Sequence, residues 1–278
     1  MSLHHGLAAV LFDKPTAVRL IGFMPRHLPA LACLLAWTHP AVAMVGGAPT
    51  ASASAYRSEV MLLSDRGNLC TGIVINQDLV LTAAHCLEPG LNYKLYELDA
   101  ERNPVFHDLA KTVVHPRFSR ATFDANRATA DIALLKVATP LPAKFVPATL
   151  AGPRSRVAVG ERFIVVGYGV TAPRDNRTAA VLRRADLIAT GQPGNLQLRL
   201  FDPATKGDTP GLGACTGDSG GPAYEERNGK RLVYGVISWT TGPKLGSGCG
   251  GLTGVTPLEL YLAWISETAR KLGSPLAP

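Results

Sequence analysis

Hydrophobic residues along this chain gather in short runs separated by turn-forming residues. The runs cover 59–64, 71–76, 79–84, 111–115, 131–137, 162–169, 182–189, 196–201 and 231–239. Glycine, proline and asparagine lie between them, which is typical of antiparallel sandwiches and barrels. Helical spacing of apolar residues is convincing only in "PLELYLAWISETARKL", 257–272. The pattern predicts an all-β protein that ends in a helix.

The first 43 residues follow a different pattern. From Met24, "MPRHLPALACLLAWTHPAVA" has a basic start, an apolar run and then the tripeptide AVA. This pattern predicts a signal peptide that is cleaved after Ala43. The apolar run is well short of the roughly 18 residues needed to span a bilayer, so we expect no stable membrane anchor. Residues 1–23 lack the pattern. Either the signal peptide has a long region before it, or translation begins at Met24.

Length and charge fit one exported domain over 44–278, either secreted or periplasmic. The chain has 278 residues, of which 46% are apolar, enough for a large core. Its net charge is +7, and removing the leader takes away three basic residues and one acidic residue, which leaves +5. Because no block of lysine and arginine accompanies this mild charge, we expect no nucleic-acid partner.

Cysteine usage supports export. Cys33 leaves with the leader, and an even number remains for two disulfides, with three possible pairings. No C-x-x-C pair or histidine cluster is present, so a zinc site is not expected. The acidic residues of 88–103 do not have the spacing of a calcium loop. We therefore predict neither a metal nor a cofactor.

The stretch "GACTGDSGGPAY", 213–224, contains a candidate nucleophile, Ser219. The same letters satisfy G-x-S-x-G, the turn that carries the serine of an α/β-hydrolase. That class requires a histidine after the serine, but no histidine follows His115. The order that remains is histidine, then aspartate, then serine.

A serine hydroxyl needs a base to take its proton, and the base needs an orienting group. His85 follows an apolar run in "LVLTAAHCLE", which holds an imidazole at the end of a strand. Asp131 opens the apolar run "DIALLKV", where a carboxylate is costly to bury without a partner such as a histidine N–H. His107 and His115 have no such context, and we interpret them as structural.

Three fragments in this order, "LTAAHC", "DIALLK" and "GDSGGP", resemble the active-site motifs of trypsin/chymotrypsin-like serine proteases. The segments "MVGG" at 44–47, "HPRF" at 115–118, "GYG" at 167–169 and "SW" at 238–239 resemble further landmarks of that family. The resemblance implies two antiparallel six-stranded β-barrels, over about 44–150 and 151–278, followed by the C-terminal helix. With only two disulfides, the chain resembles an exported bacterial member.

The resemblance also implies a role for each matching residue. His85 is the general base and then the acid, Asp131 orients it, and Ser219 forms an acyl-enzyme. The backbone N–H groups of Gly217 and Ser219 form the oxyanion hole, and the family's disulfide pairs correspond to Cys70–Cys86 and Cys215–Cys249.

In most members of this family a new N-terminal ammonium group pairs with the aspartate before the nucleophile. Here the corresponding residues are Met44 and Asp218. No basic residue precedes Met44, but the AVA tripeptide ends directly before it. We therefore expect signal-peptide removal itself to create the active terminus.

The resemblance places the floor of the specificity pocket at Gly213 and Ala214. Neither is charged, so we predict cleavage after uncharged residues, with small to medium apolar side chains preferred. Gly254 corresponds to a wall position that keeps the pocket open, so aromatic side chains remain possible. The segment 240–248 is longer than usual in the family, so either Thr240 narrows the entrance or the whole loop is displaced. Ser238, Trp239 and Thr240 offer a strand edge to the substrate backbone.

These observations predict a secreted, monomeric serine endopeptidase that acts on protein or peptide substrates and that a protein inhibitor can block. Two alternatives remain open. One is a catalytically silent relative that binds partners, and the other is an esterase-like hydrolase with the same triad.

Overall fold

The computed structural model describes residues 44–277 apart from 100, 102, 155 and 193. The predicted signal peptide, which ends at Ala43, lies outside the described residues. Among the helices of the described part, none is long and apolar enough to cross a membrane.

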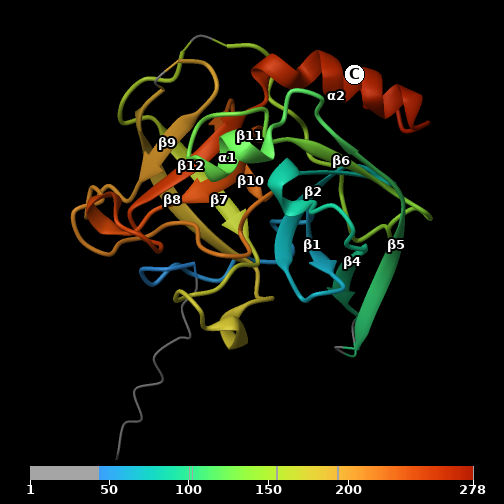
Figure 1. Cartoon of the computed structure of the whole chain (residues 1–278), viewed down its shortest axis with the longest axis horizontal. Helices are drawn as coiled ribbons and strands as arrows, with labels where there is room; N and C mark the ends of the chain where they lie inside the picture. Colours follow the sequence, from blue (N-terminus) through green and yellow to red (C-terminus); the bar gives the residue numbers. More distant parts are fainter. Residues whose placement is uncertain (1–43, 100, 102, 155, 193, 278) are drawn as a thin grey trace, which may run out of the picture. The chain divides into compact units, whose positions relative to one another are not determined.

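The described residues form two closed antiparallel barrels of six strands each (Figure 1). The first contains β1 (Glu59–Ser64), β2 (Leu69–Asn76), β3 (Leu79–Thr82), β4 (Tyr93–Leu98), β5 (Pro104–Val114) and β6 (Ala133–Val137). The second contains β7 (Arg162–Gly167), β8 (Arg183–Gly191), β9 (Leu198–Phe201), β10 (Pro222–Arg227), β11 (Lys230–Thr240) and β12 (Leu252–Pro257). The predicted fold class is confirmed.

Helices are few and short. They are α1 (Arg120–Asp124) and α2 (Leu262–Lys271), with the 3-10 turns η1 (Ala84–Cys86), η2 (Asn176–Thr178), η3 (Pro243–Leu245) and η4 (Glu259–Tyr261). The predicted C-terminal helix is thus present as α2. It lies beside β6 (Figure 1), and the residues after it are tied to the first barrel because Asn76 donates to the Pro275 carbonyl at 2.7 Å.

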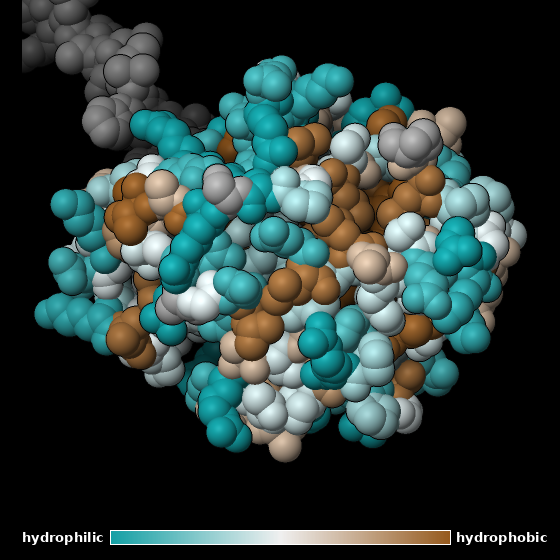
Figure 2. Space-filling view, turned by 90° about the horizontal axis from the view of Figure 1, so that it is seen from above, coloured by the Kyte–Doolittle hydropathy of each residue, from teal (hydrophilic) through white to brown (hydrophobic). Residues whose placement is uncertain are grey.

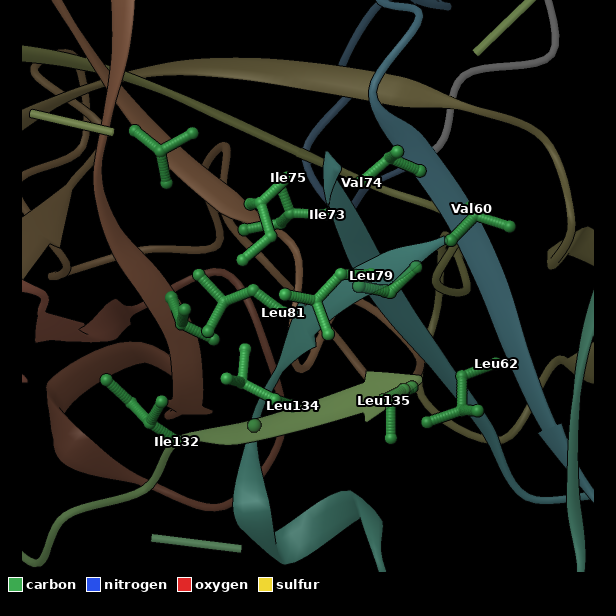
Figure 3. Packing of buried hydrophobic residues seen from close by; sticks show 14 of the residues in the cluster. Val60, Leu62, Ile73, Val74, Ile75, Leu79, Leu81, Ile132, Leu134 and Leu135 are labelled. Atoms are coloured by element: carbon green, nitrogen blue, oxygen red, sulfur yellow. The ribbon is translucent and has the colours of Figure 1, made fainter. Parts of the chain in front are cut away.

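Branched apolar side chains from β1, β2, β3 and β6 fill the interior of the first barrel (Figure 3). Leu79, Leu81 and Leu134 are fully buried there. In this packed interior, Thr82 pairs with Ala133 where β3 ends and β6 begins. That register brings the residues just beyond the two strand ends close together, and these residues include His85 and Asp131.

The segment that follows the leader lies against the second barrel. Met44 is fully buried in its core, Val45 forms a bridge with Gly213, and Thr50 forms one with Arg183. The sequence analysis predicted a first barrel over about 44–150, which included this segment. The backbone pairing gives the start of the described chain a place beside the loop that leads to Ser219.

On the face of the molecule seen in Figure 2, hydrophobic side chains gather in separate patches among hydrophilic ones. The large exposed apolar residues come from distant parts of the chain and include Phe106, Val159 and Leu245. Scattered apolar residues of this kind are normal on the surfaces of folded proteins.

Candidate active site

His85 lies in η1, directly after β3, and its orientation is fixed by Asp131. The His85 backbone N–H donates to Asp131 Oδ1 at 2.8 Å, and the ring Nδ1 lies 2.7 Å from Oδ2. An ionised carboxylate only accepts hydrogen bonds, so Nδ1 carries the proton and Nε2 presents a lone pair. His85 is thereby held in the tautomer that a general base requires.

Asp131 is almost completely buried, with 1% of its surface exposed. Besides His85, the Ser238 hydroxyl donates to its Oδ2. Three donors stabilise the ionised carboxylate in a place where an unpaired charge would be costly. Ser238, predicted only as part of the substrate-binding edge, therefore also holds the Asp131 carboxylate.

Ser219 lies in the loop between Cys215 and β10. Its backbone carbonyl accepts a hydrogen bond from the Thr71 N–H of β2 at 2.8 Å, which ties the loop to the first barrel. Ser219 and His85 line the same cavity of about 710 Å³. Among the hydrogen bonds of the described residues none joins their side chains, and such bonds are often long in unliganded enzymes.

Both disulfides brace this region. Cys70–Cys86 joins β2 to the turn that carries His85, and Cys215–Cys249 joins the Ser219 loop to the segment before β12. These are the two pairs that the resemblance implies.

Two backbone N–H groups beside Ser219 have no acceptor among the described residues. The Thr216 carbonyl accepts from Val170 N–H at 2.9 Å, and the Asp218 carbonyl accepts from Gly221 N–H at 3.0 Å. Since N–H and C=O point in opposite directions across a trans peptide, the N–H groups of Gly217 and Ser219 face away from these two donors. Neither donates to another described residue.

Glycine is required at position 217. Its φ is +96°, and a Cβ there would lie 2.9 Å from the Gly169 Cα. Both a left-handed backbone and a backbone neighbour therefore exclude a side chain at this position.

Asp218, the residue before Ser219, is fully buried. Its Oδ1 accepts from the Gly169 N–H and its Oδ2 from the Cys215 N–H, both at 2.8 Å. Burial raises the pKa of Asp218 to about 7, although these N–H donors and the charge of Arg183 act in the opposite direction. A Cβ at Gly167 or Gly169 would lie 2.3 or 2.6 Å from the carboxyl group, so the "GYG" motif makes room for it.

Of the predicted pocket residues, Ala214, Trp239 and Thr240 line the cavity, whereas Gly213, Ser238 and Gly254 are not among its lining residues. The Thr240 hydroxyl lies 3.0 Å from the Ala214 carbonyl and 3.1 Å from the Leu252 carbonyl. Its side chain therefore lies between the loop before Ser219 and the start of β12. A Cβ at Gly254 would lie 2.0 Å from the Trp239 indole. The space that Gly254 leaves free is therefore filled by the Trp239 indole.

Phe123 was missed by sequence reasoning. Its ring stacks on the His85 imidazole with the ring centroids 4.4 Å apart and the planes 12° from parallel. It is carried by α1, whose first turn is capped because the Ser119 hydroxyl accepts from Thr122 N–H at 3.2 Å. The sequence predicted no helix here, and the available signal was the capping serine before "RATFD".

The other two histidines lie away from the catalytic cavity. His107 Nε2 lies 2.9 Å from Glu97 Oε1. His115 is buried, with its ring 5.0 Å from that of Tyr261 and 4.7 Å from that of Trp264, and burial lowers its pKa. Their contacts agree with a structural role.

Comparison with known proteins agrees with this fold and site. Residues 44–265 match the model of the Trypsin family. The chain is 30% identical to trypsin of Sus scrofa over 81% of its own length and 95% of that protein. It is 32% identical to vitamin K-dependent protein C of Rattus norvegicus over 80% of its length, and the match spans about half of that relative. The chain belongs to the trypsin family.

Proposed function

We propose that the chain is an exported serine endopeptidase that cleaves after small uncharged residues by using Ser219, His85 and Asp131. The observation that carries this proposal is the imidazole of His85. Its Nδ1 is bonded to a buried carboxylate, and its Nε2 is left to face the cavity that Ser219 lines.

The chemistry follows from these groups. The Ser219 oxygen bonds to the scissile carbonyl carbon while His85 Nε2 takes its proton, and the oxyanion accepts hydrogen bonds from the N–H groups of Gly217 and Ser219. As the C–N bond breaks, His85 returns the proton to the leaving amine, which gives an acyl-enzyme. Water then attacks the ester by the same route and restores the Ser219 hydroxyl.

A fluorophosphonate probe tests the nucleophile. The folded chain should gain the mass of one adduct, located on the peptide that contains Ser219. A folded chain that gains no adduct would support the silent binding protein instead. Turnover of small acyl esters without cleavage of peptide bonds would support the esterase.

Activation is proposed to follow removal of the leader after Ala43. The new ammonium group of Met44 would pair with Asp218, a fully buried carboxylate that forms no ion pair with another described residue and feels only the charge of Arg183. The support is the position of residues 44–47. Val45 forms a bridge with Gly213, and a Cβ at Gly46 would lie 2.3 Å from the Gly211 backbone. An active preparation whose terminus lies several residues from Met44 would contradict this route.

This route predicts a difference in how stability depends on pH. With the leader attached, the pKa of Asp218 is raised from 3.8 to about 7. The folded chain then keeps a proton that the unfolded chain loses, so the free energy of unfolding should fall as the pH rises from about 4 to 7. Pairing with the Met44 ammonium lowers this pKa, and the fall should disappear.

Urea unfolding of Ser219→Ala chains from pH 4 to 8, with and without the leader, measures this difference. Asp218→Asn in the longer chain is the control and should remove the fall. If the free energy of unfolding changes with pH in the same way with and without the leader, pairing between Met44 and Asp218 is refuted.

Thr240 is proposed to set the preference for a small side chain before the cleaved bond. Replacing Thr240 by glycine removes the hydroxyl that lies near the carbonyls of Ala214 and Leu252. The ratio of kcat/KM for leucine over alanine at this substrate position should rise by about tenfold, because a methylene-sized change in such a pocket has effects of this order.

Thr240→Ser is the matched control, since it keeps the hydroxyl and should move the ratio much less. Matched peptide anilides measure the ratio. An unchanged ratio in Thr240→Gly, or wild-type cleavage after lysine or arginine, would overturn the pocket assignment.

A further inference from the structure

A second cavity of about 510 Å³ adjoins the catalytic one. Trp239 and Thr240 line both cavities, so the two cavities lie side by side at the end of β11. The other walls come from α1 and the loop after it, from β9, and from the loop between β11 and β12. Phe123, which stacks on His85, forms part of the same lining.

The charge of this second cavity is positive. Arg127 and Arg199 both line it, and both are exposed to solvent. Neither guanidinium group forms an ion pair or a hydrogen bond with another residue in the described ranges. Among the described lining residues there is no carboxylate. Two guanidinium groups without an acidic partner favour a ligand that carries a carboxylate.

The backbone of β11 shows how a substrate reaches this cavity. Pairing between β10 and β11 ends at Val236, whereas β12 pairs with β11 as far as Thr240. Ser238 to Thr240 therefore keep one free edge, on which an extended peptide can add as an antiparallel strand. A peptide that ends at Ser219 then runs from Thr240 towards Ser238, and its earlier residues lie near the second cavity because each residue spans about 3.3 Å.

We propose that this cavity is a subsite for an acidic side chain of the substrate, located three or four residues before the cleaved bond. This proposal rests on the proposed endopeptidase function. Arg127 and Arg199 bind the carboxylate, while Phe123 and Trp239 contact the methylene groups of an aspartate or glutamate. The preferred substrates are then acidic segments that end in a small uncharged residue.

Cleavage of a mixed peptide library, mapped by mass spectrometry, tests the subsite without assuming the residue before the cleaved bond. The wild-type protein should enrich aspartate and glutamate three or four residues upstream by about fivefold over asparagine and glutamine, as expected for partly exposed ion pairs. The double variant R127Q/R199Q should lose this enrichment and keep its other preferences.

The matched control is Arg270→Gln, because Arg270 is exposed on α2 and lines neither cavity. It should keep the enrichment. Wild-type cleavage without acidic enrichment, or enrichment that persists in R127Q/R199Q, would overturn the subsite and leave the endopeptidase proposal intact. A protein that neither cuts the library nor reacts with a fluorophosphonate would overturn the proposed function itself. A protein that reacts but cuts nothing would overturn the subsite.

Discussion

Replacing Ser219 by alanine is expected to lower kcat for peptide hydrolysis by about 10⁶-fold. Without the hydroxyl, no acyl-enzyme forms, and His85 has no nucleophile to activate in the cavity that both residues line. The N–H groups of Gly217 and Ser219 remain, so a small residual rate through direct attack of water is expected.

The fold should survive this change. In the described part of the chain, the Ser219 side chain makes no hydrogen bond, whereas its backbone is held by Thr71. The thermal midpoint should therefore stay within a few degrees of wild type. Ser54→Ala, at an exposed serine, is the control and should leave kcat unchanged. A folded Ser219→Ala protein within tenfold of wild-type activity would place the nucleophile elsewhere.

Strands with continuous apolar runs were predictable from the sequence. The runs at 59–64 and 162–169 became β1 and β7 because each contributes buried residues to a barrel. Three strands were missed. β4 alternates polar and apolar residues, and β10 ends in charged residues. β12 contains Gly254 and ends at Pro257. None of the three has the composition or the long apolar run by which a strand is predicted.

The closeness of His85 and Asp131 was predictable because their motifs lie at strand ends. Thr82 and Ala133 are register partners, and this long-range pairing brings His85 beside Asp131. The contacts of Phe123 and Ser238 were not predictable in the same way. They depend on how a five-residue helix and the end of β11 are placed around the imidazole, and no local pattern records that placement.

Replacing Asp131 by asparagine is expected to lower kcat by about 10⁴-fold while leaving the fold intact. The carboxylate accepts from the His85 backbone N–H, from its ring Nδ1 and from the Ser238 hydroxyl. An amide has only one oxygen for the three donors, so its NH₂ group faces Nδ1. Nδ1 must then accept, the proton moves to Nε2, and the imidazole can no longer take the Ser219 proton.

Steady-state kinetics on one peptide substrate, beside a fluorophosphonate labelling rate, measure this effect. Both should fall together, with KM little changed, because the loss arises in proton transfer and not in binding. Ser238→Ala is the informative comparison. It removes one donor to Asp131 but leaves both His85 bonds, so its loss should be far smaller. An Asp131→Asn protein that labels at the wild-type rate would show that another group orients His85. Equal losses in the two variants would instead mean that Ser238 holds the carboxylate in the position on which the imidazole depends.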